Sequence, residues 1–116
     1  MLAAASAGGP AVAAEAARYG LIGRIKAQPG RGDELAAILA ADAGTMPGCL
    51  SYIVAEDVSD RDTLWISEVW SSKDAHAASL KLPQVRAAIA KGRPLIAAFD
   101  TVAETKNASG PGLPRA

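Results

Sequence analysis

The residue types best suited to chemistry occur together in one short stretch, residues 68–76, which reads EVWSSKDAH. It holds Trp70 and the only histidine of the chain, His76. An imidazole, with an unperturbed pKa of about 6.5, is the side chain best able to accept and release a proton at neutral pH. An indole offers a flat apolar ring on which an aromatic ligand can stack, or which simply fills a core. The stretch therefore predicts proton transfer beside an aromatic guest, or else a packed tryptophan followed by an exposed histidine.

Cysteine and metal chemistry are disfavoured by the same sequence. Cys49 is the only cysteine, which excludes an internal disulfide and any metal site built from cysteines. It stands beside Leu50 in an apolar segment with no histidine near in sequence, so we expect a small buried side chain and no nucleophile. One histidine and scattered carboxylates provide no cluster of metal ligands, and we expect no metal.

The composition limits the kinds of partner. Of 116 residues, 12 are basic and 12 acidic, with no run of Lys or Arg, so we expect no nucleic-acid partner. No uninterrupted apolar run reaches about 18 residues, so we expect no membrane span. Hydrophobic residues nonetheless make up 50% of the chain, a high share for one small domain. We therefore expect a chain with this composition to bury apolar surface against a partner.

Strand and helix patterns alternate between residues 19 and 106. Alternating side chains indicate half-buried strands, and apolar residues at helical spacing indicate helices capped by Asp33 and by Ser71 or Ser72. Pro83 should kink or split the second helix, because a proline inside a helix removes a hydrogen bond. The expected strands are residues 19–28, 49–56, 63–70 and 97–105, and the expected helices are residues 33–44, 71–82 and 85–91.

This β-α-β-β-α-β order predicts a ferredoxin-like α+β domain, a four-stranded antiparallel sheet with the helices on one face. Alternation puts Leu64, Ile66 and Trp70 on one face of their strand. It puts Trp65 and Val69 on the other. A sheet that is apolar on both faces, with helices for only one, needs a second sheet. We therefore expect a homodimer, with Trp65 in its interface or in the core.

The two ends of the chain differ from this domain. Residues 1–18 are rich in Ala and are expected to form a tail, and residues 107–116, with two prolines and two glycines, are expected to be disordered. The start also resembles the remnant of an export signal, although the positive charge that begins such a signal is missing. We expect a cytoplasmic protein with its domain at residues 19–106, and export is the alternative.

Four segments of this domain resemble the antibiotic biosynthesis monooxygenase family in their order and spacing. They are PGRGDEL at residues 29–35, MPGCLSYIV at 46–54, LWISEVW at 64–70 and AIAKGRPLIAAF at 88–99. The resemblance implies a dimeric α+β barrel. It also implies an enzyme that oxidises a small phenol or quinol with dioxygen and uses no flavin, haem or metal.

The resemblance also assigns roles to particular residues. Trp70 matches the tryptophan that the family has at the end of the third strand, after Glu68, where the ring lines the pocket. The family's histidine often lies one helical turn after His76, at the position of Ser79, and many members have another at the position of Gln84. His76 and Ser79 are three residues apart and share a helix face. We therefore expect His76 to act as the general base and Trp70 as the stacking wall.

A base is needed because ground-state dioxygen reacts poorly with a neutral phenol but accepts an electron from a phenolate. Four residues are candidates for binding the substrate: Tyr52, Glu68, Ser79 and Arg86. Tyr52 can donate a hydrogen bond to a quinone oxygen or merely seal the sheet. Arg86 can bind an anionic group or be a solvated arginine on a helix.

Two other functions stay open. A dimer of the same fold without catalysis, which binds a small ligand or only supports structure, also fits the absence of the usual family histidines. A haem-degrading relative is less favoured. A resemblance to that branch would imply an asparagine in the first strand, and residues 19–28 contain none.

Overall fold

The computed structural model describes residues 18–41 and 45–114. The tail expected at residues 1–18 lies outside the described residues, apart from Arg18, and so does the end of the first expected helix at residues 42–44. Within the described residues the elements follow the expected order. They are β1 (Tyr19–Ala27), α3 (Gly32–Ala40), β2 (Cys49–Asp57), β3 (Asp60–Trp70), α4 (Lys73–Ser79), α5 (Pro83–Gly92), the 3-10 helix η2 (Arg93–Leu95) and β4 (Ile96–Lys106).

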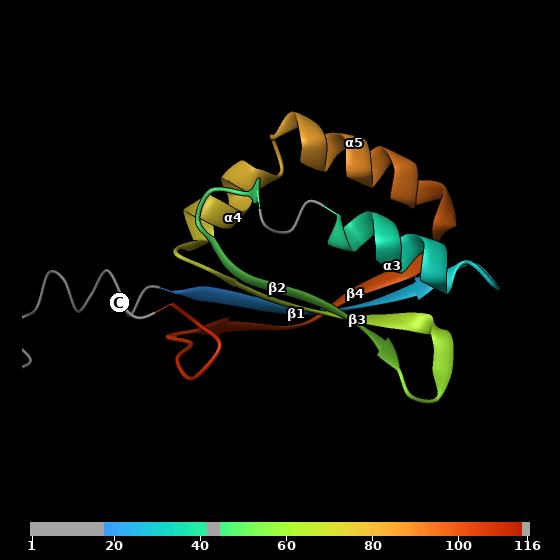
Figure 1. The fold of residues 1–116 in the computed structure, drawn as a ribbon, viewed down its shortest axis with the longest axis horizontal. Helices are drawn as coiled ribbons and strands as arrows, with labels where there is room; N and C mark the ends of the chain where they lie inside the picture. The colour runs from blue at the N-terminus through green and yellow to red at the C-terminus, as the bar shows by residue number, and fades with distance from the viewer. Residues whose placement is uncertain (1–17, 42–44, 115–116) are drawn as a thin grey trace, which may run out of the picture.

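The strands form one antiparallel sheet in the order β2-β3-β1-β4. The helices α3, α4 and α5 lie on the same side of this sheet, and no helix of the described residues covers its other side (Figure 1). This arrangement confirms the predicted ferredoxin-like α+β fold. Helix α3 packs mainly over β2 and β3, and α4 packs over the end of β3.

The core lies between the helices and the central strands. Leu35 of α3 is fully buried against the sheet, and Leu64 of β3 is fully buried against the helices. Burying an aliphatic side chain of this size contributes about 1.5–3 kcal/mol, so a few such residues fix how α3 sits on the sheet. The buried cluster consists of Ile25, Ala27, Leu35, Leu64, Ile66 and Leu95.

Pro83 divides the helical segment that follows β3. Ser72 caps α4 by accepting a hydrogen bond from the backbone N–H of Ala75 at 3.0 Å. Leu82 is extended, and Pro83 occupies the first turn of α5, where its missing N–H costs no hydrogen bond. The expected interruption is therefore confirmed as a split into two separate helices, and Ser72, not Ser71, provides the cap.

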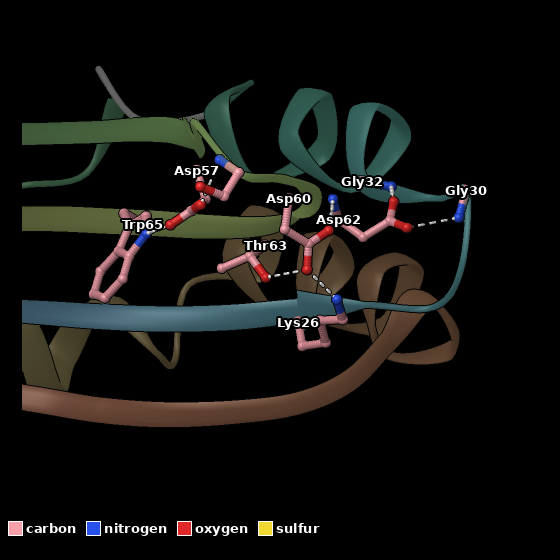
Figure 2. A network of polar contacts seen from close by, with 9 residues as sticks. Lys26, Gly30, Gly32, Asp57, Asp60, Asp62, Thr63 and Trp65 are labelled. Atoms are coloured by element: carbon pink, nitrogen blue, oxygen red, sulfur yellow. Dashed lines mark hydrogen bonds and ion pairs between the residues drawn. The ribbon is translucent and has the colours of Figure 1, made fainter.

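A network of polar contacts fixes the end of the sheet where β3 begins (Figure 2). The carboxylate of Asp62 accepts hydrogen bonds from the backbone N–H groups of Gly30, at 2.9 Å, and Gly32, at 3.1 Å. Asp60 binds the ammonium group of Lys26 and accepts the hydroxyl of Thr63 at 2.9 Å. These contacts join the loop before α3 to the β2–β3 hairpin, and so set the position of α3 over β3.

The open face of the sheet has an apolar centre. One row of paired residues crosses all four strands and consists of Ile53, Ser67, Ile22 and Ala103. Ile53 is 58% exposed and Ile22 is 36% exposed. In the next row Arg24 lies 5.7 Å from the centroid of the Trp65 ring and forms an ion pair with Asp100 at 3.1 Å. This face therefore carries apolar side chains that no other described element covers.

Residues 107–114 contain no helix or strand, and they are joined to the start of β1. The backbone N–H of Asn107 donates to the carbonyl of Arg18 at 2.9 Å. The guanidinium of Arg18 in turn donates to the carbonyls of Ala108, at 3.4 Å, and Pro114, at 2.7 Å. These three contacts hold residues 107–114 beside the start of β1.

Candidate active site

Trp70 and Glu68 are the last two residues of β3 whose side chains point to the helix-covered face of the sheet. They are two residues apart, so both point to the same side of the strand. Trp70 is 1% exposed, and its indole Nε1 donates a hydrogen bond to Glu68 Oε1 at 2.9 Å. The indole therefore holds one oxygen of a carboxylate beneath the helices.

His76 lies over this pair from α4. Its ring packs edge-on against Trp70, with centroids 5.3 Å apart and an interplanar angle of 70°. Its Nε2 atom is 3.8 Å from Glu68 Oε1, which is longer than a hydrogen bond. The side chains of His76 and Glu68 are 21% and 16% exposed. An imidazole and a carboxylate are thus held together in a largely dry environment.

The register of the sheet brings Tyr52 and Leu21 into the same row as Glu68. Directly paired side chains on one face lie about 5 Å apart at Cβ. Tyr52 makes no hydrogen bond to any other described residue, and no buried side-chain nitrogen or oxygen in the described chain lacks a partner. The Tyr52 hydroxyl therefore reaches accessible space, where it can act as a donor.

Burial and charge shape the ionisation of these groups. Burial raises the pKa of Glu68, although the Trp70 hydrogen bond and the charge of His76 partly lower it. Burial, followed by the negative charge of Glu68, raises the pKa of Tyr52 and of the Cys49 thiol. Tyr52 therefore stays protonated, and Cys49 is not activated as a thiolate.

Cavities surround this cluster on the helix-covered side of the sheet. One of about 130 Å³ has Trp70, Ser79 and Tyr52 in its walls. Another of about 130 Å³ has Gly23, Tyr52 and Phe99 in its walls. A groove of about 840 Å³ runs over β1 and β4, within the size range of small-molecule sites. Glu68 borders all three spaces.

The remaining expected residues are placed differently. Ser79 is buried, and its hydroxyl donates to the carbonyl of His76 at 2.6 Å, which leaves only its lone pairs for a ligand. Arg86 is exposed on α5 and borders none of these cavities. The structure therefore brings together Trp70, His76, Glu68, Tyr52 and Ser79, and leaves Arg86 apart.

Tyr19 is a site residue that the sequence did not indicate. Its ring centroid lies 5.7 Å from that of His76, and its hydroxyl donates to Glu104 Oε2 at 2.6 Å. This hydrogen bond, together with burial and the charges of Glu104 and Glu68, raises the pKa of Tyr19 to about 12. Lys73 lies 3.7 Å from the same carboxylate. Tyr19, Lys73 and Glu104 thus form a charged and aromatic rim beside His76.

Within the part of the chain that the structure describes, no three His, Cys, Asp or Glu side chains are placed to hold a metal ion. Among the described helices, none has the length and hydropathy needed to cross a bilayer.

The fold and these contacts define a small α+β domain with a carboxylate, an imidazole and an indole around apolar cavities. The family model of the antibiotic biosynthesis monooxygenases matches residues 18–91. The chain belongs to this family. No curated protein gives a significant match.

Solved structures agree with this assignment. A protein from Chloroflexus aurantiacus, assigned to the same family, is 56% identical, with a TM-score of 0.80, and the match covers 84% of this chain and 99% of that one. A family protein from Caulobacter crescentus is 24% identical, with a TM-score of 0.67 and coverage of 81% and 92%. A conserved protein from Methanosarcina mazei shares the fold at 10% identity, with a TM-score of 0.68 and coverage of 84% and 99%.

Proposed function

We propose that this protein is a monooxygenase that oxidises a small phenol or quinol with dioxygen and uses no flavin, haem or metal. The observation that carries the proposal is the placement of Glu68 and His76 beside the buried ring of Trp70, at apolar cavities. The family assignment supports it. This reaction needs a proton acceptor next to an aromatic wall, and the cluster provides two such acceptors beside the Trp70 ring.

The chemistry follows from the electronic state of dioxygen. A base removes the hydroxyl proton of the phenol, and the resulting phenolate gives one electron to dioxygen, forming a phenoxyl radical and superoxide. These two combine at a ring carbon, and the resulting peroxide anion takes back the proton that the base removed, which gives a hydroperoxide. The hydrogen on that carbon then leaves as the O–O bond breaks, which releases water and leaves a carbonyl. Phenol and dioxygen thus become quinone and water, and no external electron donor is needed.

The residues fit separate tasks in this scheme. Trp70 is the wall on which the substrate ring stacks. Tyr52, kept protonated by burial, donates a hydrogen bond to the substrate oxygen. Ser79 offers lone pairs at the same cavity. The surrounding apolar side chains exclude water, which strengthens these polar interactions and protects the radical pair.

We also propose that two copies of the chain pair through their open sheet faces. The apolar row that contains Ile53 and Ile22 supports this arrangement. Two sheets packed face to face keep about 10 Å between them and interdigitate their side chains. The helix-covered face, with the candidate site, is left free in each copy.

The test of the function is oxygen uptake with a panel of hydroquinones and phenols. The wild-type protein should consume dioxygen and form the quinone from a phenol or the hydroxyquinone from a hydroquinone, and no product should form without oxygen. His76→Ala should lower turnover by about 100-fold, because positioned proton transfer contributes about 10²–10⁴. Arg86→Ala should leave KM unchanged, since Arg86 is apart from the cavities. Quinone formation in the absence of oxygen would contradict the proposal.

A second function is supported by one observation. Ser79 occupies the usual position of the family histidine, and its hydroxyl is already bonded to the backbone of its own helix. A dimer that binds a small apolar ligand without oxidising it fits this arrangement. Saturable binding of hydroquinones without oxygen uptake would favour it. A haem titration without a Soret shift would separate both functions from haem degradation.

A further inference from the structure

We propose that Glu68 is the group that removes the substrate's proton, and that His76 passes this proton on towards solvent. The assignment rests on the proposed function and divides between two residues the work that a single histidine would otherwise do. It follows from how the two side chains are held, which atoms are free, and which spaces they face.

The two oxygens of Glu68 have different surroundings. Oε1 accepts the Trp70 indole N–H at 2.9 Å and faces His76. Oε2 has no hydrogen-bond or ion-pair partner among the described residues, and it is not a buried atom without a partner, so it reaches the cavity space. The carboxylate is thus anchored by one oxygen and offers the other as a proton acceptor.

Glu68 also has the central position. It borders both small cavities and the wide groove, whereas His76 borders only one small cavity and the groove. A substrate ring that packs against Trp70 therefore contacts the Glu68 carboxylate, whichever of these three spaces it enters. Geometry of this kind identifies a candidate base before its ionisation is considered.

His76 is placed to receive the proton afterwards. Its ring lies beside the rings of Trp70 and Tyr19, and its Nε2 atom is 3.8 Å from Glu68 Oε1. A small ring rotation or one bridging water closes that gap to a hydrogen bond. The His76 side chain is 21% exposed and borders the wide groove, so the imidazole can pass the proton from Glu68 on to solvent in that groove.

The charge balance favours the transfer. The phenol O–H bond breaks, its electron pair stays on the substrate oxygen, and the proton binds Glu68 Oε2, so one negative charge moves from the protein to the substrate. Burial favours the neutral carboxyl that results. The Tyr52 hydroxyl, in the same row as Glu68, can donate to the new phenolate. Dioxygen then accepts the electron.

The titratable groups that face Glu68 come from every neighbouring element. Cys49 and Tyr52 lie on β2, Tyr19 on β1 and His76 on α4, and each interacts with its charge. The groove adds Glu104 of β4 and Arg93 of η2 at its border. The raised pKa values of Cys49, Tyr52 and Tyr19 keep these three groups protonated near neutral pH, so none of them serves as the base.

The two tryptophans provide matched reporters for a test that needs no turnover. The Trp70 indole N–H donates to Glu68, and the Trp65 indole N–H donates to Asp57 Oδ2 at 2.8 Å. In His76→Ala protein, which lacks the imidazole packed against Trp70, each indole resonance therefore follows the ionisation of its own carboxyl group. Burial raises the pKa of Glu68, whereas hydrogen bonds from Trp65 and the Ser59 backbone lower the pKa of Asp57.

In ¹⁵N-labelled His76→Ala protein titrated from about pH 3 to about pH 8, the Trp70 signal should change at higher pH than the Trp65 signal. Adding Glu68→Gln should abolish the change at Trp70 and leave that at Trp65. A Trp70 signal that changes at or below the pH of the Trp65 signal would mark Glu68 as an ordinary ionised carboxylate. That result would overturn the assignment.

Oxygen uptake with hydroquinone gives the second measurement. Glu68→Gln keeps an acceptor for the Trp70 N–H and should lower kcat by about 100-fold or more, with KM changed less than about threefold. Glu56→Gln is the matched control, because Glu56 is exposed on β2 and borders none of these three cavities. Added imidazole should restore turnover to His76→Ala but not to Glu68→Gln.

Failure of the assignment of Glu68 as the base and failure of the proposed function give different results. If Glu68→Gln retains kcat within about threefold of the wild type, the base is another group, while the oxygenase function stands. If the wild type consumes no oxygen, the proposed function fails by itself. The indole titration then decides alone whether Glu68 is held as a proton acceptor.

Discussion

Tyr19 and Trp70 are direct partners in the β1–β3 register, and the imidazole of His76 lies beside both of their rings. The first residue of one strand and the last residue of another thus hold a side chain from a helix. This contact fixes the ring of His76 next to Glu68 before any substrate arrives, which is the preorganisation that proton transfer requires.

Trp70→Phe tests the anchoring of Glu68. The substitution keeps an aromatic ring but removes the N–H and leaves a void at a residue that is 1% exposed. We expect a loss of about 1–3 kcal/mol in the free energy of unfolding, measured with urea. The pKa of Glu68 should rise further, because the Trp70 hydrogen bond lowers it; side-chain ¹³C NMR measures this. Trp65→Phe is the control, and an equal effect of the two on Glu68 would contradict the anchoring role.

Glu68→Gln should make the protein more stable at neutral pH. The pKa of Glu68 is raised in the folded state, so its favourable contribution is present below the unfolded pKa of about 4.3 and is lost as the pH rises through the folded value. At pH 7 the ionised, largely buried carboxylate therefore opposes folding, and an amide does not. Calorimetry should find a higher Tm for the variant at pH 7 and a smaller difference at pH 4. A lower Tm at pH 7 would show that contacts with Trp70 and His76 outweigh the burial cost.

Local patterns were sufficient to predict the fold. Alternation put Leu64, Ile66 and Trp70 together on one face of their strand, and in the structure all three are buried on the helix-covered face. Pro83 marked the end of a helix for reasons confined to its own backbone. These features depend on a few neighbouring residues, so they can be read without knowing how the strands pair.

The site could be predicted only in part, because it depends on contacts between distant segments. The neighbourhood of Glu68 is set by its pairing with Tyr52 and Leu21, and that of His76 by the pairing of Tyr19 with Trp70. No local pattern encodes this register.

Arg86 was a candidate for binding an anionic group of the substrate, and in the structure it borders none of the three cavities. The helical periodicity that relates His76 to Ser79 does not continue past the break at Pro83. The direction of Arg86 is therefore set by the packing of α5 and not by its spacing from His76.

Asp60→Asn should weaken the hairpin end in a pH-dependent way. Hydrogen bonds from Lys26, the Asp62 backbone and Thr63 lower the pKa of Asp60 to about 2. The stabilisation is therefore present above the unfolded pKa of about 3.9 and is lost as the pH falls towards the folded value. The variant should have a lower Tm than the wild type at pH 7, and the two should converge near the folded value. Glu56→Gln is the control, and a Tm difference that stays constant with pH would contradict the ionic origin.

Gly32→Ala should destabilise the contact between α3 and the hairpin. A Cβ atom at this position would lie 2.2 Å from the carbonyl oxygen of Arg61, so the backbone must shift at a cost of about 1–3 kcal/mol. Gly30→Ala is a useful comparison, because its Cβ would meet nothing within 4 Å but its φ is +78°, which costs an L-residue about 1–2 kcal/mol. Both variants should lose stability in urea. Full stability of Gly32→Ala would mean that the hairpin is free to move away from α3.

Ile53→Asp tests the proposed dimer. Ile53 is 58% exposed in the row that crosses the open face, so the substitution should leave the protomer folded. In a sheet-to-sheet dimer it would bury two uncompensated carboxylates near the centre of the interface, and the dissociation constant should rise by about 100-fold or more. Sedimentation at micromolar concentration measures the change. Val58→Asp is the matched control, since Val58 is 102% exposed in the hairpin turn and not in this row. A wild-type protein that sediments as a monomer, or an Ile53→Asp variant that stays dimeric, would require another explanation for the apolar face.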